Sequence, residues 1–231
     1  MFILTKKETR LIILQRIEFL TPFLKKIRKL FGRYLFSVFI SRFFIDPSTI
    51  GKAYYNEMKK EYESIKNYID FEKKDIFSIG GGLGGLELII NKELDVKEFT
   101  FIERNFVSKK VKYGWDKDNN EAYNDLTILK NFLIKNKLPL SKFTIFNYDK
   151  DEFPNKKFDL IISLFSLDYH YNFDIYFDYL KKSSHTSTKI IFDTINTDRF
   201  NEIFKEVHII NDRTDTVHKS KRIVCSNFLS K

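Results

Sequence analysis

Five glycines within six residues constrain the fold of this chain more than any other feature of its sequence. They are Gly80, Gly81, Gly82, Gly84 and Gly85. An apolar run at 76–79 precedes them, a segment of helical character follows at 83–92, and a second apolar run at 99–102 ends at Glu103. This order of strand, glycine turn, helix and strand predicts a βαβ unit in a parallel sheet.

The glycine turn and the acid together predict a site for a nucleoside cofactor. Glycine adopts positive φ angles and has no Cβ, so the N–H groups of the turn can approach a bound nucleotide closely. An acid at the end of the next strand can accept two hydrogen bonds from a ribose diol. We therefore predict that the cofactor is bound by Gly80, Gly81, Gly82, Gly84 and Glu103.

The rest of the chain alternates segments of helix and strand character. Helices are expected over 50–69, 121–135 and 174–182, and strands over 143–146, 158–164 and 189–193. Two last strands, at 206–210 and 222–228, suit an antiparallel hairpin at the edge of the sheet. We therefore predict one α/β domain over 50–231, with a mostly parallel, Rossmann-like sheet.

The positive charge of the chain lies almost entirely in its first 45 residues. They hold ten lysine and arginine side chains against two acids, whereas the whole chain has a net charge of +9. Helical periodicity over 6–21, the helix start Thr21-Pro22 and the apolar run 33–45 predict a basic helical extension over 1–49. Three roles fit it: a layer packed on the main domain or a partner subunit, an arm on an anionic membrane surface, or a grip on nucleic acid.

Several classes of protein are disfavoured by composition. The single cysteine, Cys225, excludes an intramolecular disulfide, and the four histidines show no ligand spacing, so we expect no metal site. The sequence shows neither a spanning apolar run nor the order of a signal peptide. We expect a cytoplasmic protein, with peripheral attachment to the inner face of a membrane if the extension binds lipid.

The glycine spacing fits two classes of cofactor. Gly80, Gly82 and Gly85 satisfy the dinucleotide pattern GxGxxG, whereas Gly80, Gly82 and Gly84 satisfy GxGxG. A dinucleotide-binding protein of the usual form needs a second mononucleotide-binding half, but this chain ends in a hairpin. The Tyr-x-x-x-Lys pair of short-chain oxidoreductases also does not occur at a suitable distance downstream.

Over residues 75–193 the chain resembles the class I S-adenosylmethionine-dependent methyltransferases. The similar stretches are 79–85 to their first motif, Glu103 to their ribose-binding acid, 149–154 to their Asp-x-x-x-apolar-Pro segment and 158–163 to their fourth strand. The resemblance implies a class I methyltransferase fold and S-adenosyl-L-methionine as cofactor. It further implies that Asp149 lies beside the adenine amino group and that Ser163 lies at the cofactor. Ser78 is a departure, because many members carry an acid at that position.

Residues 112–115, 121–126 and 163–171 are similar to stretches of bacterial sugar O-methyltransferases. This narrower resemblance implies a hydroxyl acceptor on a small or glycan-linked substrate. A hydroxyl must lose a proton on methylation, and an imidazole exchanges protons near neutral pH, so we predict His170 as the base and Asp168 as its orienting partner or as a ligand of the substrate hydroxyl. Alternatively, His170 makes only a loop contact and the enzyme works by proximity.

Two other functions stay open at this stage. One is an RNA methyltransferase that uses the basic extension as an electrostatic grip. The other is a methyltransferase-like subunit that binds a nucleoside without turnover. In either case Tyr54 or Tyr55, on the helix before the glycine turn, could cover the cofactor or simply pack in the core. The sequence gives no indication of the oligomeric state.

Overall fold

The computed structural model describes residues 1–69, 74–109, 122–212 and 219–229. Its described strands form one seven-stranded sheet with the order β3-β2-β1-β4-β5-β7-β6. The strands are β1 (Asp75–Ile79), β2 (Glu98–Glu103), β3 (Phe143–Asn147), β4 (Phe158–Ser163), β5 (Ser184–Thr194), β6 (Phe204–Asp212) and β7 (Lys221–Phe228).

The sheet is parallel from β3 to β5 and antiparallel at its other edge. β1 pairs in parallel with both β2 and β4, so the strand before the glycine turn lies near the centre of the sheet. β7 runs antiparallel to β5 and also to β6, between which it lies. The predicted fold class, a mostly parallel sheet with an antiparallel hairpin at its C-terminal edge, is confirmed.

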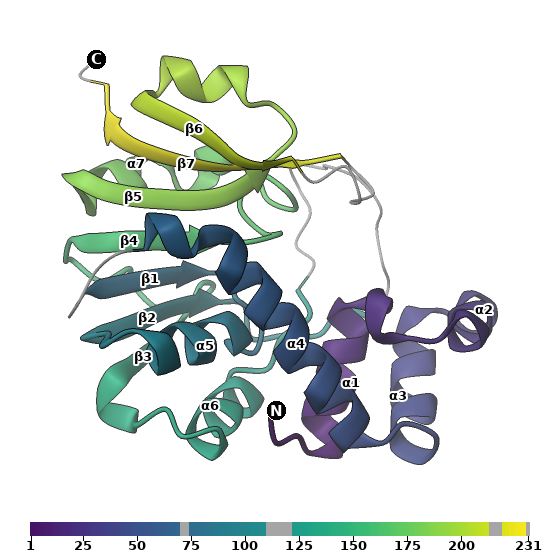
Figure 1. Ribbon diagram of the computed structural model, residues 1–231. Helices are drawn as coiled ribbons and strands as arrows, with labels where there is room; N and C mark the ends of the chain where they lie inside the picture. Colours follow the sequence, from purple (N-terminus) through teal and green to yellow (C-terminus); the bar gives the residue numbers. More distant parts are fainter. Residues whose placement is uncertain (70–73, 110–121, 213–218, 230–231) are drawn as a thin grey trace.

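Helices cover both faces of the sheet (Figure 1). They are α1 (Lys6–Gln15), α2 (Pro22–Phe31), α3 (Arg33–Phe43), α4 (Pro47–Ile65), α5 (Gly85–Glu93), α6 (Leu126–Lys135) and α7 (Phe177–Lys182), with short 3₁₀ helices at Ile17–Phe19, Lys66–Tyr68, Leu140–Lys142, Phe173–Ile175 and Asp198–Glu202. Neighbouring residues of β1 point to opposite faces. Ile76 packs in the core under α1, α4, α5 and α6, whereas Phe77 packs in the core under α7 and the 3₁₀ turns.

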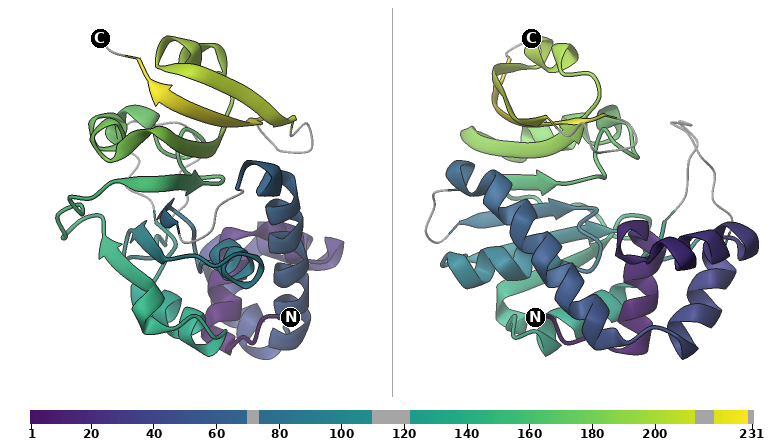
Figure 2. Two further views of the ribbon diagram at one scale, coloured as in Figure 1. Left: turned by 60° about the vertical axis from the view of Figure 1, so that its left-hand side comes forward. Right: turned by 45° about the vertical axis from the view of Figure 1, so that its right-hand side comes forward.

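The three helices before α4 differ in how they pack. α1 buries four consecutive apolar residues, 11–14, in the same core as α4 and the sheet. α2 has no buried residue, and α3 buries Phe36 and Ser37. Both views of Figure 2 show α1 against the body of the molecule, and the right-hand view shows α2 and α3 standing out from it.

Several element ends differ from the predicted ones for local reasons. Asp46 accepts hydrogen bonds from the amides of Ser48 and Thr49, so α4 begins at Pro47 rather than at 50, and it gives way to a 3₁₀ turn after Ile65. Asp125 caps α6 in the same way, and that helix begins at 126 rather than 121. The segment predicted as a helix over 174–182 is a 3₁₀ turn followed by the short α7.

Candidate functional site

The glycine turn between β1 and α5 has a backbone that ordinary residues rarely adopt. Gly80, Gly82 and Gly84 have φ angles of +65°, +66° and +75°, in the left-handed region that only glycine enters at little cost. Gly84 is the N-cap of α5, so the first amides of that helix face the turn. The N-terminus of α5 therefore lies at the carboxyl end of β1, the position at which parallel α/β sheets bind their ligands.

Close neighbours of the turn also require glycine. A Cβ at Gly80 would lie 2.0 Å from Oγ of Ser166, and a Cβ at Gly82 would lie 2.9 Å from Oε1 of Gln15. Ser166 follows β4, whereas Gln15 is the last residue of α1. The turn is thus enclosed by the loop after β4 and by the end of the first helix.

Glu103, at the end of β2, lies directly against the glycine turn. Its Oε1 accepts a hydrogen bond of 2.7 Å from the amide of Gly82, and its carboxyl group also accepts one from the side chain of Asn124. Burial raises the pKa of Glu103 from 4.5 to about 8, although these two hydrogen bonds oppose the shift. The acid predicted to bind ribose is therefore a buried acceptor beside the glycine turn.

Gln15 and Asn124 are site residues that were not predicted, although Asn124 lies in the stretch 121–126 of the narrower resemblance. Asn124 donates from Nδ2 to the carbonyl of Gly82 over 2.7 Å, and Gln15 donates from Nε2 to the carbonyl of Tyr123 over 2.8 Å. An amide on the first helix and an amide in a loop carry no pattern that would associate them with the glycines. Asn124 thus takes up a carbonyl of the turn that a ligand could use, and Gln15 lies close to the same glycine.

A second buried acid lies on the other side of the turn. Ser78 donates a hydrogen bond of 2.5 Å to Oε1 of Glu87 on α5, and a Cβ at Gly81 would lie 2.9 Å from the same oxygen. Burial raises the pKa of Glu87 to about 7 against the effect of that hydrogen bond. Its Oε2 is buried without a hydrogen-bond partner among the described residues. Glu87 thus brings a carboxyl group to the place where Ser78 departs from the class I pattern.

Ser163 and Asp149 lie at the ends of β4 and β3, on either side of this centre. Ser163 donates to the carbonyl of Ile79 over 2.8 Å and accepts from the amide of Leu167 over 2.9 Å, so its hydroxyl ties β4 to β1. The carboxylate of Asp149 is half-exposed and lies 3.3 Å from Nε of Arg104. The predicted contacts of both residues with the cofactor stay predictions.

Asp168 and His170 lie in the loop after β4. Asp168 is buried with a positive φ of 55°, and its Oδ2 accepts a hydrogen bond of 2.5 Å from Thr194 at the end of β5. Burial raises its pKa, while the Thr194 hydrogen bond opposes the shift. His170 is exposed and packs edge-on against Tyr169 at 4.9 Å between ring centroids. Thr194 holds Asp168 against β5, and the role of Asp168 as partner of His170 stays a prediction.

Tyr54, on α4, packs directly beneath the turn. Its hydroxyl accepts a hydrogen bond of 3.2 Å from the amide of Gly85, and its ring would lie 2.6 Å from a Cβ at that glycine. The side chain is buried, and burial raises the pKa of its hydroxyl. Tyr54 therefore supports the start of α5 from the core side.

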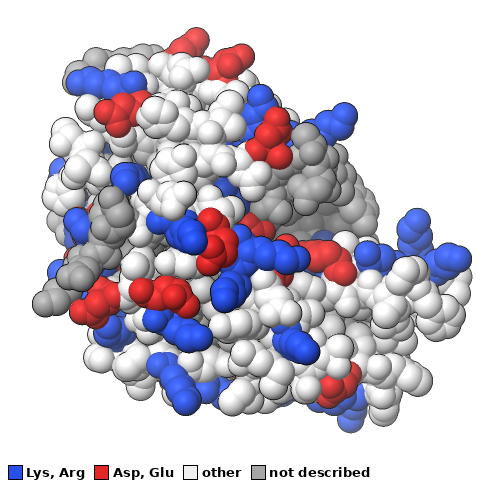
Figure 3. Space-filling model, viewed as in Figure 1, with Lys and Arg blue, Asp and Glu red and all other residues white. Residues whose placement is uncertain are grey.

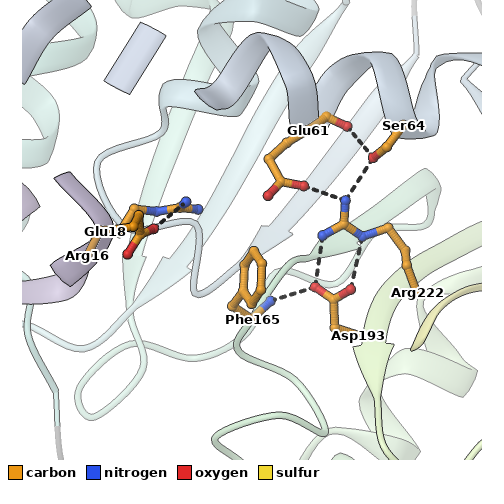
Figure 4. A network of polar contacts seen from close by, with 7 residues as sticks. All are labelled: Arg16, Glu18, Glu61, Ser64, Phe165, Asp193 and Arg222. Atoms are coloured by element: carbon orange, nitrogen blue, oxygen red, sulfur yellow. Dashed lines mark hydrogen bonds and ion pairs between the residues drawn. The ribbon is translucent and has the colours of Figure 1, made fainter. Parts of the chain in front are cut away.

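A buried network links the hairpin to the loop after β4 (Figure 4). The guanidinium of Arg222 on β7 donates two hydrogen bonds of 3.0 Å to the carboxylate of Asp193 on β5. It also donates to Glu61 over 2.5 Å and to Ser64 over 2.8 Å, both on α4. The amide of Phe165 donates to Asp193 over 3.1 Å. The network therefore positions the loop that carries Asp168 and His170.

Some predicted features fall outside the described residues. These are the stretch 112–115 and residue 121 of the narrower resemblance. Within the part of the chain that the structure describes, no group of three or more His, Cys, Asp or Glu side chains is placed to hold a metal ion. Searched over the same residues, the helices include none with the length and apolarity needed to cross a bilayer.

Comparisons with known proteins agree with this geometry at the level of the fold. The sequence matches no protein-family model and no curated protein. Among solved structures, a candidate S-adenosyl-L-methionine-dependent methyltransferase from Methanococcus maripaludis superposes with a TM-score of 0.53 at 15% identity, over 79% of this chain and 90% of that one. The chain has the Rossmann-like fold of a methyltransferase.

Other solved methyltransferases show a lower similarity. A ribosomal protein L11 methylase from Lactobacillus delbrueckii gives a TM-score of 0.46 at 14% identity, over 71% of this chain and 75% of that one. A candidate O-methyltransferase from Nostoc punctiforme gives 0.48 at 12% identity, over 74% and 56%. The chain thus spans little more than half of the Nostoc protein, and 49% of the length of YjhP from E. coli. At 15% identity the likeness to the Methanococcus protein establishes the fold alone, and these weaker matches add nothing to it.

Proposed function

We propose that this protein is an S-adenosyl-L-methionine-dependent methyltransferase that methylates a hydroxyl group of a small or glycan-linked acceptor. The observation that carries the proposal is the position of Glu103, a buried carboxyl group at the end of β2 that contacts a turn with three left-handed glycines at the end of β1. A ribose diol would supply two donors to that carboxyl group. The glycine turn and Glu103 therefore fit the nucleoside part of the cofactor.

Glu87 supports the assignment of S-adenosyl-L-methionine at the methionine part of the cofactor. Its Oε2 is a buried acceptor without a described partner, under the glycine turn and beside Ser78. Such an oxygen is costly unless a donor reaches it. The ammonium of the methionine part is a donor of the right charge, and we propose that Glu87 holds the place of the acid that Ser78 lacks.

The residues of this chain would then bind the cofactor, align the acceptor hydroxyl with it and take up the hydroxyl proton. When bound, the cofactor supplies an electrophilic methyl group. The protein mainly has to hold an acceptor oxygen in line with it, and the loop after β4, held by Asp193 and Thr194, is the element we assign to this task. His170 on that loop would accept the proton of the hydroxyl. The choice of oxygen and of a sugar rests on the similarity of residues 163–171 to sugar O-methyltransferases.

Binding requires the turn to be uncovered. Asn124 is bonded to the carbonyl of Gly82, and the side chain of Gln15 lies over the same residue. These two side chains must be displaced or incorporated when a ligand enters. The same closure is the observation that favours the second candidate, a methyltransferase-like subunit without turnover.

Calorimetric titration of S-adenosyl-L-methionine and, separately, NADH tests the proposal. The wild-type chain should bind the sulfonium cofactor and not NADH. Glu103→Gln keeps an acceptor for the Gly82 amide but replaces the other carboxyl oxygen, which a ribose hydroxyl would use, by an NH2 donor, and we expect about 10- to 100-fold weaker binding. Glu98→Gln, at the other end of β2 and paired with Lys156, is the matched control and should bind as the wild type does.

The three possible failures differ in meaning. Binding of NADH alone would overturn the methyltransferase assignment. Binding of neither ligand would overturn the cofactor assignment and would favour a subunit without turnover whose glycine turn stays covered by Gln15 and Asn124. Binding of S-adenosyl-L-methionine without transfer of its methyl group to any sugar, glycan or RNA in a screen would leave the cofactor assignment standing and overturn the proposed reaction.

A further inference from the structure

The segment formed by α2, α3 and the residues that join them, 19–45, combines strong positive charge with exposed apolar surface. It holds six cationic side chains and no acid, between Glu18 and Asp46. They are Lys25, Lys26, Arg28, Lys29, Arg33 and Arg42. We call this segment the basic arm. Figure 3 shows its outer end as a projecting lobe with blue side chains along one edge and white surface elsewhere.

α2 is an amphipathic helix whose apolar side is only partly covered by the described residues, with Leu24 and Ile27 half-buried against the core. Phe23, Leu30 and Phe31 are 69%, 81% and 56% exposed, and at spacings of seven and eight they lie on one side of the helix together with Ile27. No residue of this helix is buried. An amphipathic helix in a globular protein normally buries its apolar face, so this face is built for something outside the described chain.

α3 continues the apolar surface. Leu35, Phe39 and Phe43 follow one another at four-residue spacing and are 52%, 60% and 66% exposed. The inward side of the same helix is formed by Phe36 and Ser37, both fully buried. α3 is therefore anchored to the protein through one face while an adjacent face presents leucine and phenylalanine to solvent.

Lys25 and Lys29 lie on the side of α2 opposite its apolar stripe, whereas Lys26 and Arg28 flank the stripe. Lys26 and Lys29 are exposed, and Lys25 is half-buried. In a helix of this kind, cations at the level of lipid headgroups flank an apolar face that enters the acyl region. The arrangement thus matches the two requirements of an interfacial helix on an anionic bilayer.

We propose that the basic arm docks this protein on an anionic membrane surface, with the apolar faces of α2 and α3 inserted. Nucleic acid would account for the cations but would leave six large apolar side chains in water. A second copy of the arm would bring like charges together, which disfavours it as an occupant. An anionic bilayer offers negative headgroups to the cations of the arm and an acyl region to its apolar side chains.

Contacts of Arg33 attach the basic arm to the end of α1, beside the candidate site. Arg33 donates to the carbonyl of Leu14 and lies 4.3 Å from the ring of Tyr123. Gln15, next to Leu14, lies over Gly82. In Figure 1 the arm accordingly lies on the side toward which the parallel strands point. Docking would therefore bring the candidate site close to the membrane, although the proposal does not depend on methyl transfer.

Co-sedimentation of the full chain with vesicles tests the proposal. Vesicles of phosphatidylcholine alone are compared with vesicles of about three parts phosphatidylcholine to one part phosphatidylglycerol. We expect binding to the mixed vesicles that is weaker at high salt. The triple variant Lys25→Gln, Lys26→Gln, Lys29→Gln should lose about 100-fold in affinity. The triple variant Phe23→Ser, Leu30→Ser, Phe39→Ser should lose at least about 10-fold.

Matched controls remove similar groups elsewhere. Lys52→Gln, Lys59→Gln, Lys60→Gln neutralises three exposed lysines of α4. Leu140→Ser, Ile175→Ser, Ile195→Ser removes three apolar side chains that are 58%, 48% and 53% exposed. Both controls should bind as the wild type does, and circular dichroism should show all four variants folded.

Each of the following results would overturn the proposal. The first is absence of binding to the mixed vesicles, and the second is equal loss in arm and control variants. The third is binding of single-stranded RNA, abolished by the lysine variant and unchanged by the serine variant, without binding to vesicles. The fourth is a dimer in solution that the serine variant alone converts to a monomer, which would assign the apolar surface to a second copy.

Discussion

The amide of Gly82 donates a hydrogen bond of 2.7 Å to Oε1 of Glu103. The glycine turn of β1 and the end of β2 are therefore joined through the acid that we assign to the ribose. Because Glu103 is buried, with its pKa raised to about 8, its ionisation is coupled to the stability of the free protein. Glu87, with a pKa raised to about 7 on the other side of the turn, acts in the same direction.

The first prediction is that the ligand-free protein loses stability as the pH rises from about 5 to 8. A carboxyl group whose pKa is about 8 when folded and 4.5 when unfolded holds a proton in the folded state alone over this range. Its contribution is complete below about pH 4.5 and is lost as the pH approaches 8, by up to about 1.4 kcal/mol per pH unit. Urea unfolding of wild type and Glu103→Gln across this range measures it.

In that experiment Glu103→Gln should show a shallower fall than the wild type. Glu63→Gln is a control, because hydrogen bonding to Lys66 lowers the pKa of Glu63 and confines its titration to acid pH. Equal pH dependence in the wild type and in Glu103→Gln would show that Glu103 is ionised throughout, contrary to the effect expected from its burial.

The second prediction concerns the glycine turn. Gly80→Ala combines a φ of +65° with a Cβ 2.0 Å from Oγ of Ser166, whereas Gly32→Ala combines a φ of +76° with open space. Gly32→Ala should therefore cost about 1–3 kcal/mol of unfolding free energy from backbone strain alone. Gly80→Ala should cost about 1–3 kcal/mol more, from overpacking.

Removal of the Ser166 side chain separates these two effects. The double variant Gly80→Ala, Ser166→Gly should recover most of the extra cost in chemical denaturation, since both atoms near the new Cβ belong to that side chain. Costs for Gly80→Ala and Gly32→Ala that agree within error would mean that the loop after β4 moves aside freely.

The third prediction is that His170→Gln slows methyl transfer by about 100- to 10,000-fold without changing the affinity for S-adenosyl-L-methionine. His170 is exposed on the loop after β4 and is assigned to the proton of the acceptor rather than to the cofactor, so its loss should affect the reaction and not cofactor binding. His185→Gln, another exposed histidine at the start of β5, is the control. Retention of more than about a tenth of the rate would favour catalysis by proximity.

The sequence predicted those parts of the fold and site that depend on local pattern. The strand, glycine turn, helix and acid lie within about thirty residues, and each has a residue type that only a few conformations suit. The strand β5 was predicted too short, because residues 184–188 are polar, yet Ser184 pairs with Phe158 through its backbone. Backbone pairing of polar residues leaves no trace in hydrophobic periodicity.

Contacts between distant residues could not be predicted. Asn124 lies 42 residues from the Gly82 carbonyl that it binds, and Arg222 lies 161 residues from Glu61. Glu87 looks in the sequence like any acid in the first turn of a helix, and its burial becomes evident only with the sheet in place. The charge of the basic arm was evident, but whether its apolar residues face the core depends on how α2 packs.

The last prediction is that Arg222→Met costs about 3–5 kcal/mol of unfolding free energy. Arg222 is fully buried and pairs with Asp193 and Glu61, so its loss removes the cation that these two buried carboxylates share. Lys60→Met removes an exposed lysine paired with Glu57 and should cost less than about 1 kcal/mol. Equal costs for the two variants in urea unfolding would contradict the prediction.

The cost of Arg222→Lys should lie between those of Arg222→Met and Lys60→Met, because lysine keeps the charge and loses the paired hydrogen bonds to Asp193. Since Asp193 also holds the amide of Phe165, Arg222→Lys should slow methyl transfer more than it weakens cofactor binding.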